Sequence, residues 1–199
     1  MNSNEWIDKY GIIYSADKKR LIKCTNQKIE EYNIIPECEV IGDSAFLFCE
    51  ELRKIHIPAS VISIEERAFS FCYSLTSIAI PIHVTLIGAC AFQNCRKLTN
   101  VEIPENVTSI NEYTFYDCRE LTSIIIPNSV TSIGDWAFIG CVGLKNIIIP
   151  NNVISIGKKA FAYCSELESI VISDSVTEID NSAFSECNKL NNISTKPLC

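Results

Sequence analysis

Residues 127–149 read PNSVTSIGDWAFIGCVGLKNIII, and residues 150–172 read PNNVISIGKKAFAYCSELESIVI. The two segments align without a gap, and the same 23-residue period gives seven copies over residues 35–194. A fixed period of this length is typical of a solenoid, in which each copy forms one coil that its neighbours stabilise by stacking. We therefore expect one array over residues 35–194, preceded by a separate segment at 1–34 and followed by a tail at 195–199.

Four columns of the repeat hold the same residue in every copy, and their first members are Ile41, Phe46, Cys49 and Leu52. Stacking turns each column into a ladder of identical side chains, so an invariant apolar column is expected to point into the core at every coil. A single coil would bury too little apolar surface to offset the entropy of ordering its backbone. The stack as a whole is therefore predicted to be the unit that folds.

The chain has 11 cysteines, and seven of them form one of these columns. Parallel ladder side chains do not favour the dihedral angle of a disulfide, and a row of thiols has the wrong shape for a tetrahedral zinc site. We expect buried, reduced thiols that act as small apolar side chains, with no metal or cofactor. Outside this column lie Cys24, Cys38, Cys90 and Cys199, of which Cys199 is expected to be exposed.

Within one coil, Leu121, Ile124 and Ile126 have the L-x-x-L-x-L spacing that indicates a strand with alternating inward side chains. The β-branched segment 130–133 predicts a second short strand on the opposite side. The next column holds glycine at Gly42, Gly88, Gly134 and Gly157. Glycine there suggests a positive φ, with Glu65 as a strained exception. The Ala-Phe-x-x-Cys run that follows fits a single helical or 3₁₀ turn.

The two ends of a stack need covering, and the sequence treats them differently. Residues 11–15 and 20–23 are two apolar runs separated by a polar turn, which predicts a β-hairpin over the first coil. Only six residues follow Ile193. We expect the last coil to be exposed, to pair with another chain, or to be truncated from a longer array.

The overall composition limits the classes of function. The chain has 199 residues, 47% of them apolar, and a formal net charge of −7. No run reaches the roughly 18 apolar residues that a membrane span requires, so membrane insertion is not expected. The acidic balance also argues against a nucleic-acid partner. Residues 1–20 lack a signal-peptide pattern, and the abundant thiols favour a reducing compartment.

The repeat has the form IP-x-x-V-T-x-I-G-x-x-A-F-x-x-C-x-x-L-x-x-I-x-I, which closely resembles the BspA-like leucine-rich repeat family. The segment G-I-I-Y-S-x-D-x-x-x-L-I before the array is similar to the hairpin that often precedes such repeats. The resemblance implies a right-handed, β-rich leucine-rich-repeat solenoid of the α/β type. Members of the family occur in surface and secreted proteins and are associated with adhesion and protein binding, so the resemblance favours a surface or secreted location.

An enzymatic function is not expected. His56 and His83 are the only histidines, and neither has an evident partner among the ladder cysteines. A Cys–His nucleophile requires hydrogen-bond contact and an orienting third group, whereas the repeat cysteines are predicted to point inward. The sequence contains none of the common nucleotide-binding, metalloprotease or hydrolase motifs.

The variable columns are the best source of candidate contact residues, because outward positions can differ while the core repeats. Between the two inward isoleucines of the parallel strand lie Ile125, Ile148 and Val171 in three consecutive copies. They predict an outward apolar stripe, flanked two residues earlier by Ser123, Asn146 and Ser169. Glu102 occupies the same column as the stripe, one copy before Ile125, and is a further candidate contact. An apolar patch with a polar rim is typical of a protein-binding surface. The alternative is simple β-propensity on a half-exposed sheet.

A second candidate lies on another edge of the stack. Tyr113 and Trp136 occupy one column in adjacent copies, and large aromatic side chains often anchor interfaces. Packing over the turn segments is the alternative explanation.

The sequence thus predicts a non-enzymatic module that binds a protein or another extended ligand on its parallel-strand face. A structural role is the alternative, in which the uncovered last coil joins two copies of the chain into a homodimer.

Overall fold

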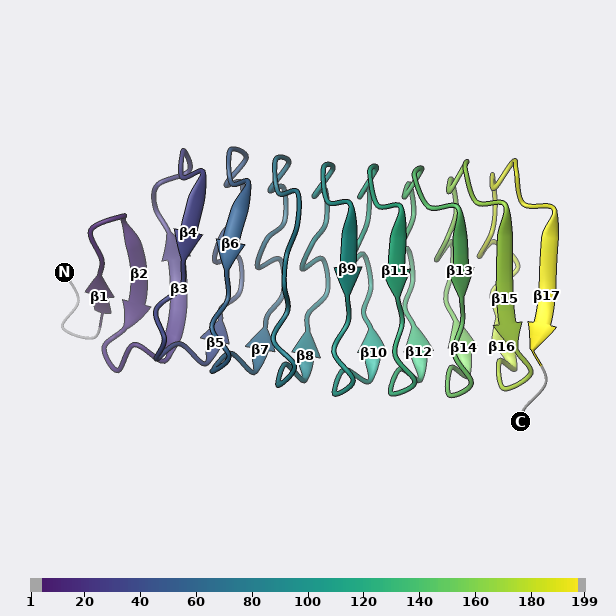
Figure 1. The fold of residues 1–199 in the computed structure, drawn as a ribbon, viewed down its shortest axis with the longest axis horizontal. Helices are drawn as coiled ribbons and strands as arrows, with labels where there is room; N and C mark the ends of the chain where they lie inside the picture. The colour runs from purple at the N-terminus through teal and green to yellow at the C-terminus, as the bar shows by residue number, and fades with distance from the viewer. Residues whose placement is uncertain (1–4, 197–199) are drawn as a thin grey trace.

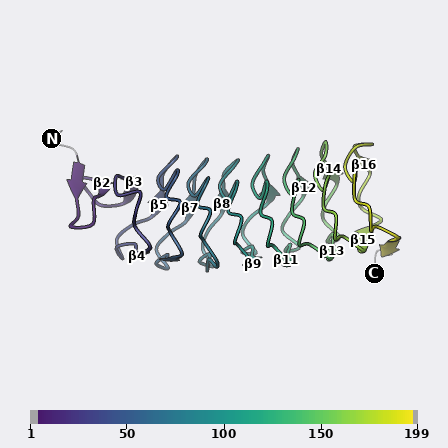
Figure 2. The same ribbon diagram turned by 90° about the horizontal axis from the view of Figure 1, so that it is seen from above.

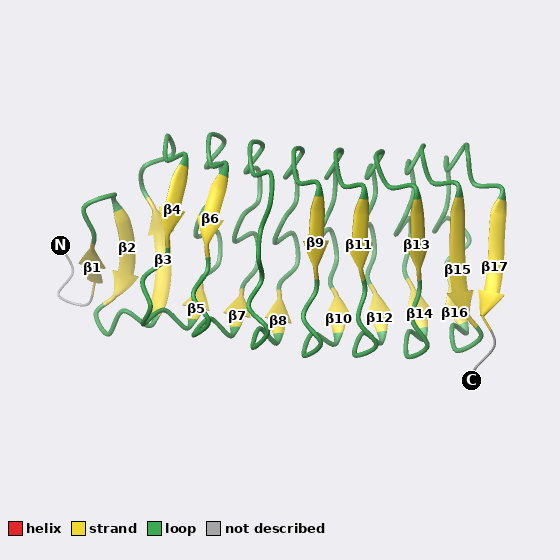
Figure 3. Ribbon diagram, viewed as in Figure 1, coloured by secondary structure: helices red, strands yellow, loops and turns green. Residues whose placement is uncertain are grey.

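The computed structural model describes the backbone of residues 5–196 and the side chains of residues 5–194. The chain forms one elongated stack of coils whose long axis runs from the N-terminus to the C-terminus (Figures 1 and 2). Its regular elements are all strands, and turns connect them (Figure 3). No helix occurs among the described residues, so none of them could cross a bilayer as a helix.

One face of the stack is a set of parallel strands separated by 23 residues. Its strands are β4 (Glu31–Asn33), β6 (Lys54–His56), β9 (Asn100–Glu102), β11 (Ser123–Ile125), β13 (Asn146–Ile148), β15 (Ser169–Ser173) and β17 (Asn192–Lys196). Between β6 and β9, the coil is marked by a single parallel bridge from Lys54 to Ser77. These seven strands and one bridge give eight rungs, the first of which lies before Ile35.

A second parallel ladder of two-residue strands runs along the opposite side, as the 130–133 pattern predicts. Its strands are β5 (Val40–Ile41), β7 (Ser63–Ile64), β8 (Leu86–Ile87), β10 (Ser109–Ile110), β12 (Ser132–Ile133), β14 (Ser155–Ile156) and β16 (Glu178–Ile179). β8 and β10 are not paired, so the ladder has a break between them. The register steps by 23 residues, with Ile110 opposite Ile133 and Ile133 opposite Ile156. The invariant isoleucine column therefore lies on this ladder and is buried from Ile41 to Ile156. The prediction that it points into the core at every coil is wrong for the last coil, where Ile179 is 42% exposed.

At the N-terminal end, β2 (Ile12–Ser15) pairs antiparallel with both β1 (Glu5–Ile7) and β3 (Arg20–Cys24). β3 also pairs in parallel with β5, which joins these strands to the second ladder. The buried Tyr14 hydroxyl lies 2.7 Å from the Tyr32 hydroxyl, which donates to Asp8 Oδ2 at 2.7 Å. Arg20 forms a two-point ion pair with Glu65, in which Nη1 donates to Oε1 at 2.9 Å. These contacts fix the N-terminal strands on the first coils.

The invariant columns build the core. The phenylalanine rings from Phe46 to Phe184 stack nearly parallel, with neighbouring centroids 5.0–5.6 Å apart. Each ladder thiol from Cys72 onward donates to the carbonyl of the phenylalanine in the preceding coil, as Cys118 does to Phe92 at 3.2 Å. The ten described cysteines are free thiols, and Cys24, Cys38 and Cys90 are buried as well. Cys199 lies outside the described residues.

The predicted helical or 3₁₀ turn in the Ala-Phe-x-x-Cys segment is wrong. In the first complete copy, the amides of Ala45, Leu47 and Cys49 close local turns. The alternate amides of Ser44, Phe46 and Phe48 instead donate to the next coil. Ser44 and Phe48 have φ values of 55° and 61°, so the right-handed helical conformation is interrupted twice. Bonding between coils thus replaces the helix in each turn.

The glycine column also behaves differently from the prediction. Positive φ occurs two residues later, at the column that contains Tyr113 and Trp136, both at 55°. Glycine instead allows the backbones of adjacent coils to approach closely, because a Cβ at Gly88 would lie 2.5 Å from the amide nitrogen of Glu66 in the preceding coil. Glu65 has no positive φ and pairs with Arg20, so it is not the strained exception that the sequence suggested.

Candidate binding surface

The predicted apolar stripe lies on the parallel-strand face. Ile125 on β11 is 65% exposed and Ile148 on β13 is 63% exposed. Val171 on β15 is half-buried beside Ile148, with which it pairs in register. The flanking residues Ile124 and Ile147 are buried, so each strand alternates between core and surface.

The parallel ladder is interrupted between β11 and β13. In the other coils a backbone bond precedes each strand, as from Thr122 N to Thr99 O at 2.9 Å and from Glu168 N to Lys145 O at 2.8 Å. The equivalent bond from Lys145 to Thr122 is missing, and the described residues show no backbone hydrogen bond between 121–126 and 144–149. The missing bond follows the turn at 140–143, in which Val142 N donates to Gly140 O at 2.8 Å. The two strands are adjacent but not joined.

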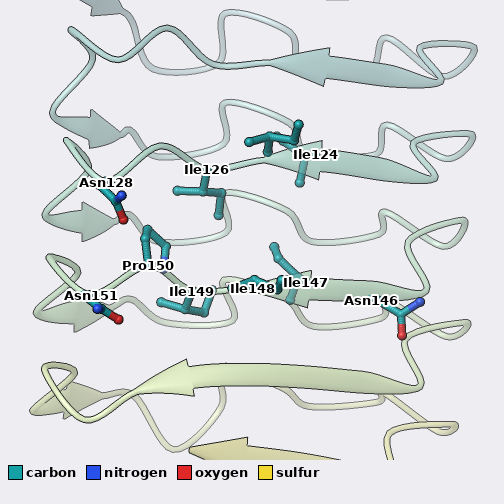
Figure 4. Close-up of a pocket in the computed structure, with 10 residues that line it drawn as sticks. Ile124, Ile126, Asn128, Asn146, Ile147, Ile148, Ile149, Pro150 and Asn151 are labelled. Carbon is teal, nitrogen blue, oxygen red and sulfur yellow. The ribbon is translucent and has the colours of Figure 1, made fainter. Parts of the chain in front are cut away.

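This interruption forms a groove of about 440 Å³ (Figure 4). Each of the two coils contributes one segment to the lining, which consists of Ile124, Ile125, Ile126, Asn128, Asn146, Ile147, Ile148, Ile149, Pro150 and Asn151. The centre is entirely aliphatic, and no ionisable side chain lines it. Such a groove favours an uncharged apolar group over a charged one, because a charge would lose hydration without gaining a partner.

Asparagine amides lie at both ends of the groove. Asn146 Oδ1 accepts a hydrogen bond from Ser169 Oγ at 2.6 Å. The side-chain amides of Asn128 and Asn151, at the other end, make no hydrogen bond with the described residues. An amide side chain can donate and accept at once, which is what recognition of a peptide backbone requires. The groove therefore combines an apolar centre with a polar rim.

The groove brings together only part of the predicted set. Ile125, Ile148 and Asn146 line it, whereas Ser123, Glu102 and Val171 lie beside it on the same face. Sequence reasoning missed Asn128 and Asn151. A signal was present, because only the two copies that begin at Pro127 and Pro150 have asparagine directly after the proline.

Tyr113 and Trp136 lie on the turn segments rather than on this face. Their rings stack with centroids 4.9 Å apart and an interplanar angle of 12°, and both side chains are half-buried. The Lys158 ammonium lies 5.7 Å from the Trp136 ring centroid. The two rings pack on each other between adjacent coils, and neither residue lines the groove.

The groups that a Cys–His enzyme would use are kept apart. His56 and His83 are exposed, whereas the ladder thiols from Cys49 to Cys164 are buried and Cys187 is partly buried. Burial raises the pKa of Cys95, Cys118 and Cys141 well above the ordinary thiol value. These thiols therefore stay protonated at neutral pH. Within the described residues no cluster of histidine, cysteine and carboxylate side chains could hold a metal ion.

The stack of parallel strands at 23-residue steps defines a leucine-rich repeat solenoid. The model of the BspA-type leucine-rich repeat region matches residues 23–127 and 108–198, and the chain belongs to this family. A comparison with curated proteins found no match.

Solved structures of bacterial leucine-rich repeat proteins have the same fold. A protein from Eubacterium ventriosum matches with a TM-score of 0.84 and 26% identity, over 94% of this chain and 50% of that one. A Bacteroides ovatus protein matches with a TM-score of 0.56 and 28% identity, over 98% and 62%. The Treponema pallidum protein TpLRR has 24% identity and a TM-score of 0.65, over 97% and 79%. The chain thus spans half the length of the Eubacterium protein.

Proposed function

We propose that this chain is a non-enzymatic binding module that takes up a protein ligand on its parallel-strand face. The observation that carries the proposal is the aliphatic groove between β11 and β13, where Ile125 and Ile148 are both mostly exposed. Family membership supports a binding role, because repeats of this type are associated with adhesion and protein contacts. An exposed apolar surface with a polar rim is a common protein interface.

The groove supports a ligand in extended form that carries an uncharged aliphatic side chain. The lining has no charge to offer, so a neutral segment would lose least on entering it. The amides of Asn128 and Asn151 are available to the ligand backbone at one end. Val171, Ser123 and Glu102 would contact the flanking parts of a longer ligand.

Selection of displayed peptides against the wild-type chain tests the proposal. Replacement of Ile125, Ile148 and Val171 by serine should lower the affinity for the selected peptides by at least roughly a hundredfold. Each aliphatic side chain that the ligand buries contributes about 1.5–3 kcal/mol to the binding free energy. Ile154→Ser is the matched control, since Ile154 is 51% exposed but lies outside the groove. The triple variant should keep the wild-type urea midpoint. Undiminished peptide affinity in the triple variant would overturn the site.

Self-association is a second candidate function, and the last coil supports it. Phe161, Cys164 and Leu167 are fully buried, but the next members of their columns, Phe184, Cys187 and Leu190, are only partly buried. β17 is an edge strand, and Ile193 on it is 60% exposed. Among the described residues no strand pairs with the outer edge of β17, and an apolar edge strand can pair with a second copy.

Light-scattering mass across a concentration series, under reducing conditions, tests this candidate. A dimer that dissociates in Ile193→Asp but persists in Ile148→Ser would support pairing through the last coil. A monomer at every concentration, or a dimer unaffected by Ile193→Asp, would contradict it.

A further inference from the structure

A second hollow lies on the turn segments and shares no lining residue with the groove. It has a volume of about 370 Å³ and spans three coils, with Tyr116, Asp117 and Arg119 from the first, Ile139, Gly140 and Val142 from the second, and Tyr163 from the third. This volume is at the lower end of the range for ligand pockets, so it suits one small ring rather than a large molecule.

Gly140 explains why the hollow forms at this coil. It occupies the positive-φ column that holds Asp117 before it and Tyr163 after it. Every other member of this column carries a side chain, so Gly140 leaves a gap between two projecting neighbours. A Cβ at Gly140 would lie 3.3 Å from Asp117 Oδ1. Ile139 and Val142 supply apolar surface beside the gap.

One edge of the pocket is a fixed polar pair. Arg119 Nε donates to Asp117 Oδ1 at 2.8 Å, and Arg96 Nε donates to Asp117 Oδ2 at 3.1 Å. The Asp117 side chain is only 16% exposed, so two arginines hold its carboxylate in place. The terminal nitrogens of Arg119 make no hydrogen bond with the described residues and remain available as donors.

Two tyrosines supply the aromatic part of the lining. Tyr163 is 51% exposed, and Tyr116 is half-buried against Tyr113 with ring centroids 5.8 Å apart. Neither hydroxyl bonds to a described residue, so both can donate to or accept from a ligand. The pocket therefore combines aromatic surface with the fixed carboxylate of Asp117 and with donors on Arg119 and the two tyrosines that are unpaired among the described residues.

We propose that this pocket binds one neutral pyranose unit of a glycan. A pyranose ring has an apolar C–H face that can pack on Tyr163, and hydroxyl groups that both donate and accept. Arg119 and the tyrosine hydroxyls offer donors, while Asp117 retains acceptor lone pairs. Of the two arginines paired with Asp117, only Arg119 lines the pocket, so the lining itself has no net formal charge and suits a neutral sugar.

Saturation-transfer NMR with millimolar methyl glycosides of glucose, galactose, mannose and N-acetylglucosamine tests the proposal. At least one glycoside should receive signal from the wild-type chain. Tyr163→Ala should lower the affinity for that glycoside about two- to tenfold, since it removes the aromatic ring on which the sugar packs. Val142→Arg should abolish binding by filling the pocket, and the stack should tolerate it because Arg96 and Arg119 occupy the same column.

Two controls separate this site from other surfaces. Phe48→Ala removes a 43% exposed aromatic side chain from the same column as Tyr163 and should leave glycoside binding unchanged. Ile148→Ser alters the groove and should also leave it unchanged. The proposal is overturned if no glycoside binds the wild type, or if the Val142→Arg variant binds the glycoside as well as the wild type does. It is also overturned if N-acetyl-phenylalanine amide binds at this pocket and no glycoside does.

Discussion

Raising the pH from 8.5 to 10 is expected to destabilise this protein steeply under reducing conditions. Seven of the described thiols are fully buried in the core, and five of them, Cys72, Cys95, Cys118, Cys141 and Cys164, form a consecutive row in which burial raises the pKa of each. In the unfolded chain a cysteine ionises near pH 8.5. Above that pH the unfolded state binds fewer protons than the folded state, so the free energy of unfolding falls as the pH rises.

The size of the effect follows from the number of thiols. Each contributes about 1.4 kcal/mol per pH unit once the unfolded form is ionised, so five give about 7 kcal/mol per pH unit. A domain whose unfolding free energy is about 5–15 kcal/mol would unfold within one to two pH units. Below pH 8.5 the thiols are protonated in both the folded and the unfolded chain, so they should not make the free energy of unfolding depend on pH. The buried Tyr14, whose pKa is raised to about 12, adds to the effect only above pH 10.

Urea midpoints measured between pH 7 and pH 10 would check this expectation. Cys118→Ala provides an internal control, because it removes one of the five thiols and should reduce the slope by about 1.4 kcal/mol per pH unit. The cavity that it leaves lowers stability equally at every pH, so only the slope reports the thiol. A stability that stays constant up to pH 10 would show that the buried thiols do not control alkaline unfolding.

Phe115→Ala, in the middle of the phenylalanine ladder, is expected to destabilise the stack strongly. Phe115 is fully buried and stacks between Phe92 and Phe138, at centroid distances of 5.6 and 5.3 Å. Removing the ring takes apolar surface from the core and leaves a cavity, which costs about 3–5 kcal/mol for phenylalanine. Because each coil depends on its neighbours, the loss should destabilise the stack on both sides.

Urea denaturation followed by far-ultraviolet circular dichroism measures this loss. Ile125→Ala serves as the comparison, since Ile125 is 65% exposed and its truncation should change the free energy of unfolding by less than about 0.5 kcal/mol. Equal midpoints for the two variants would contradict the assignment of the phenylalanine ladder as the central element of the core.

The groove could be predicted only in part. The alternation along Ser123–Ile125 and Asn146–Ile148 was sufficient to place Ile125 and Ile148 outward, because a strand alternates its side chains between two faces. The missing bond between Thr122 and Lys145 could not be predicted, since it depends on how two coils settle against each other through all their contacts. Asn128 and Asn151 became relevant only when that opening placed them at its end.

The sequence by itself determined the repeat, the inward columns of isoleucine, phenylalanine, cysteine and leucine, and the two parallel ladders. Because the copies follow one another in identical steps of 23 residues, each column has a similar environment in successive coils, and one copy predicts the others. The tertiary structure decided the conformation of the turns, where amides of Ser44, Phe46 and Phe48 bond to the next coil instead of forming a helix. It also decided where the surface is hollow, at the opening beside Ile148 and at the gap left by Gly140, because a hollow arises from the differences between neighbouring coils rather than from the repeat that they share.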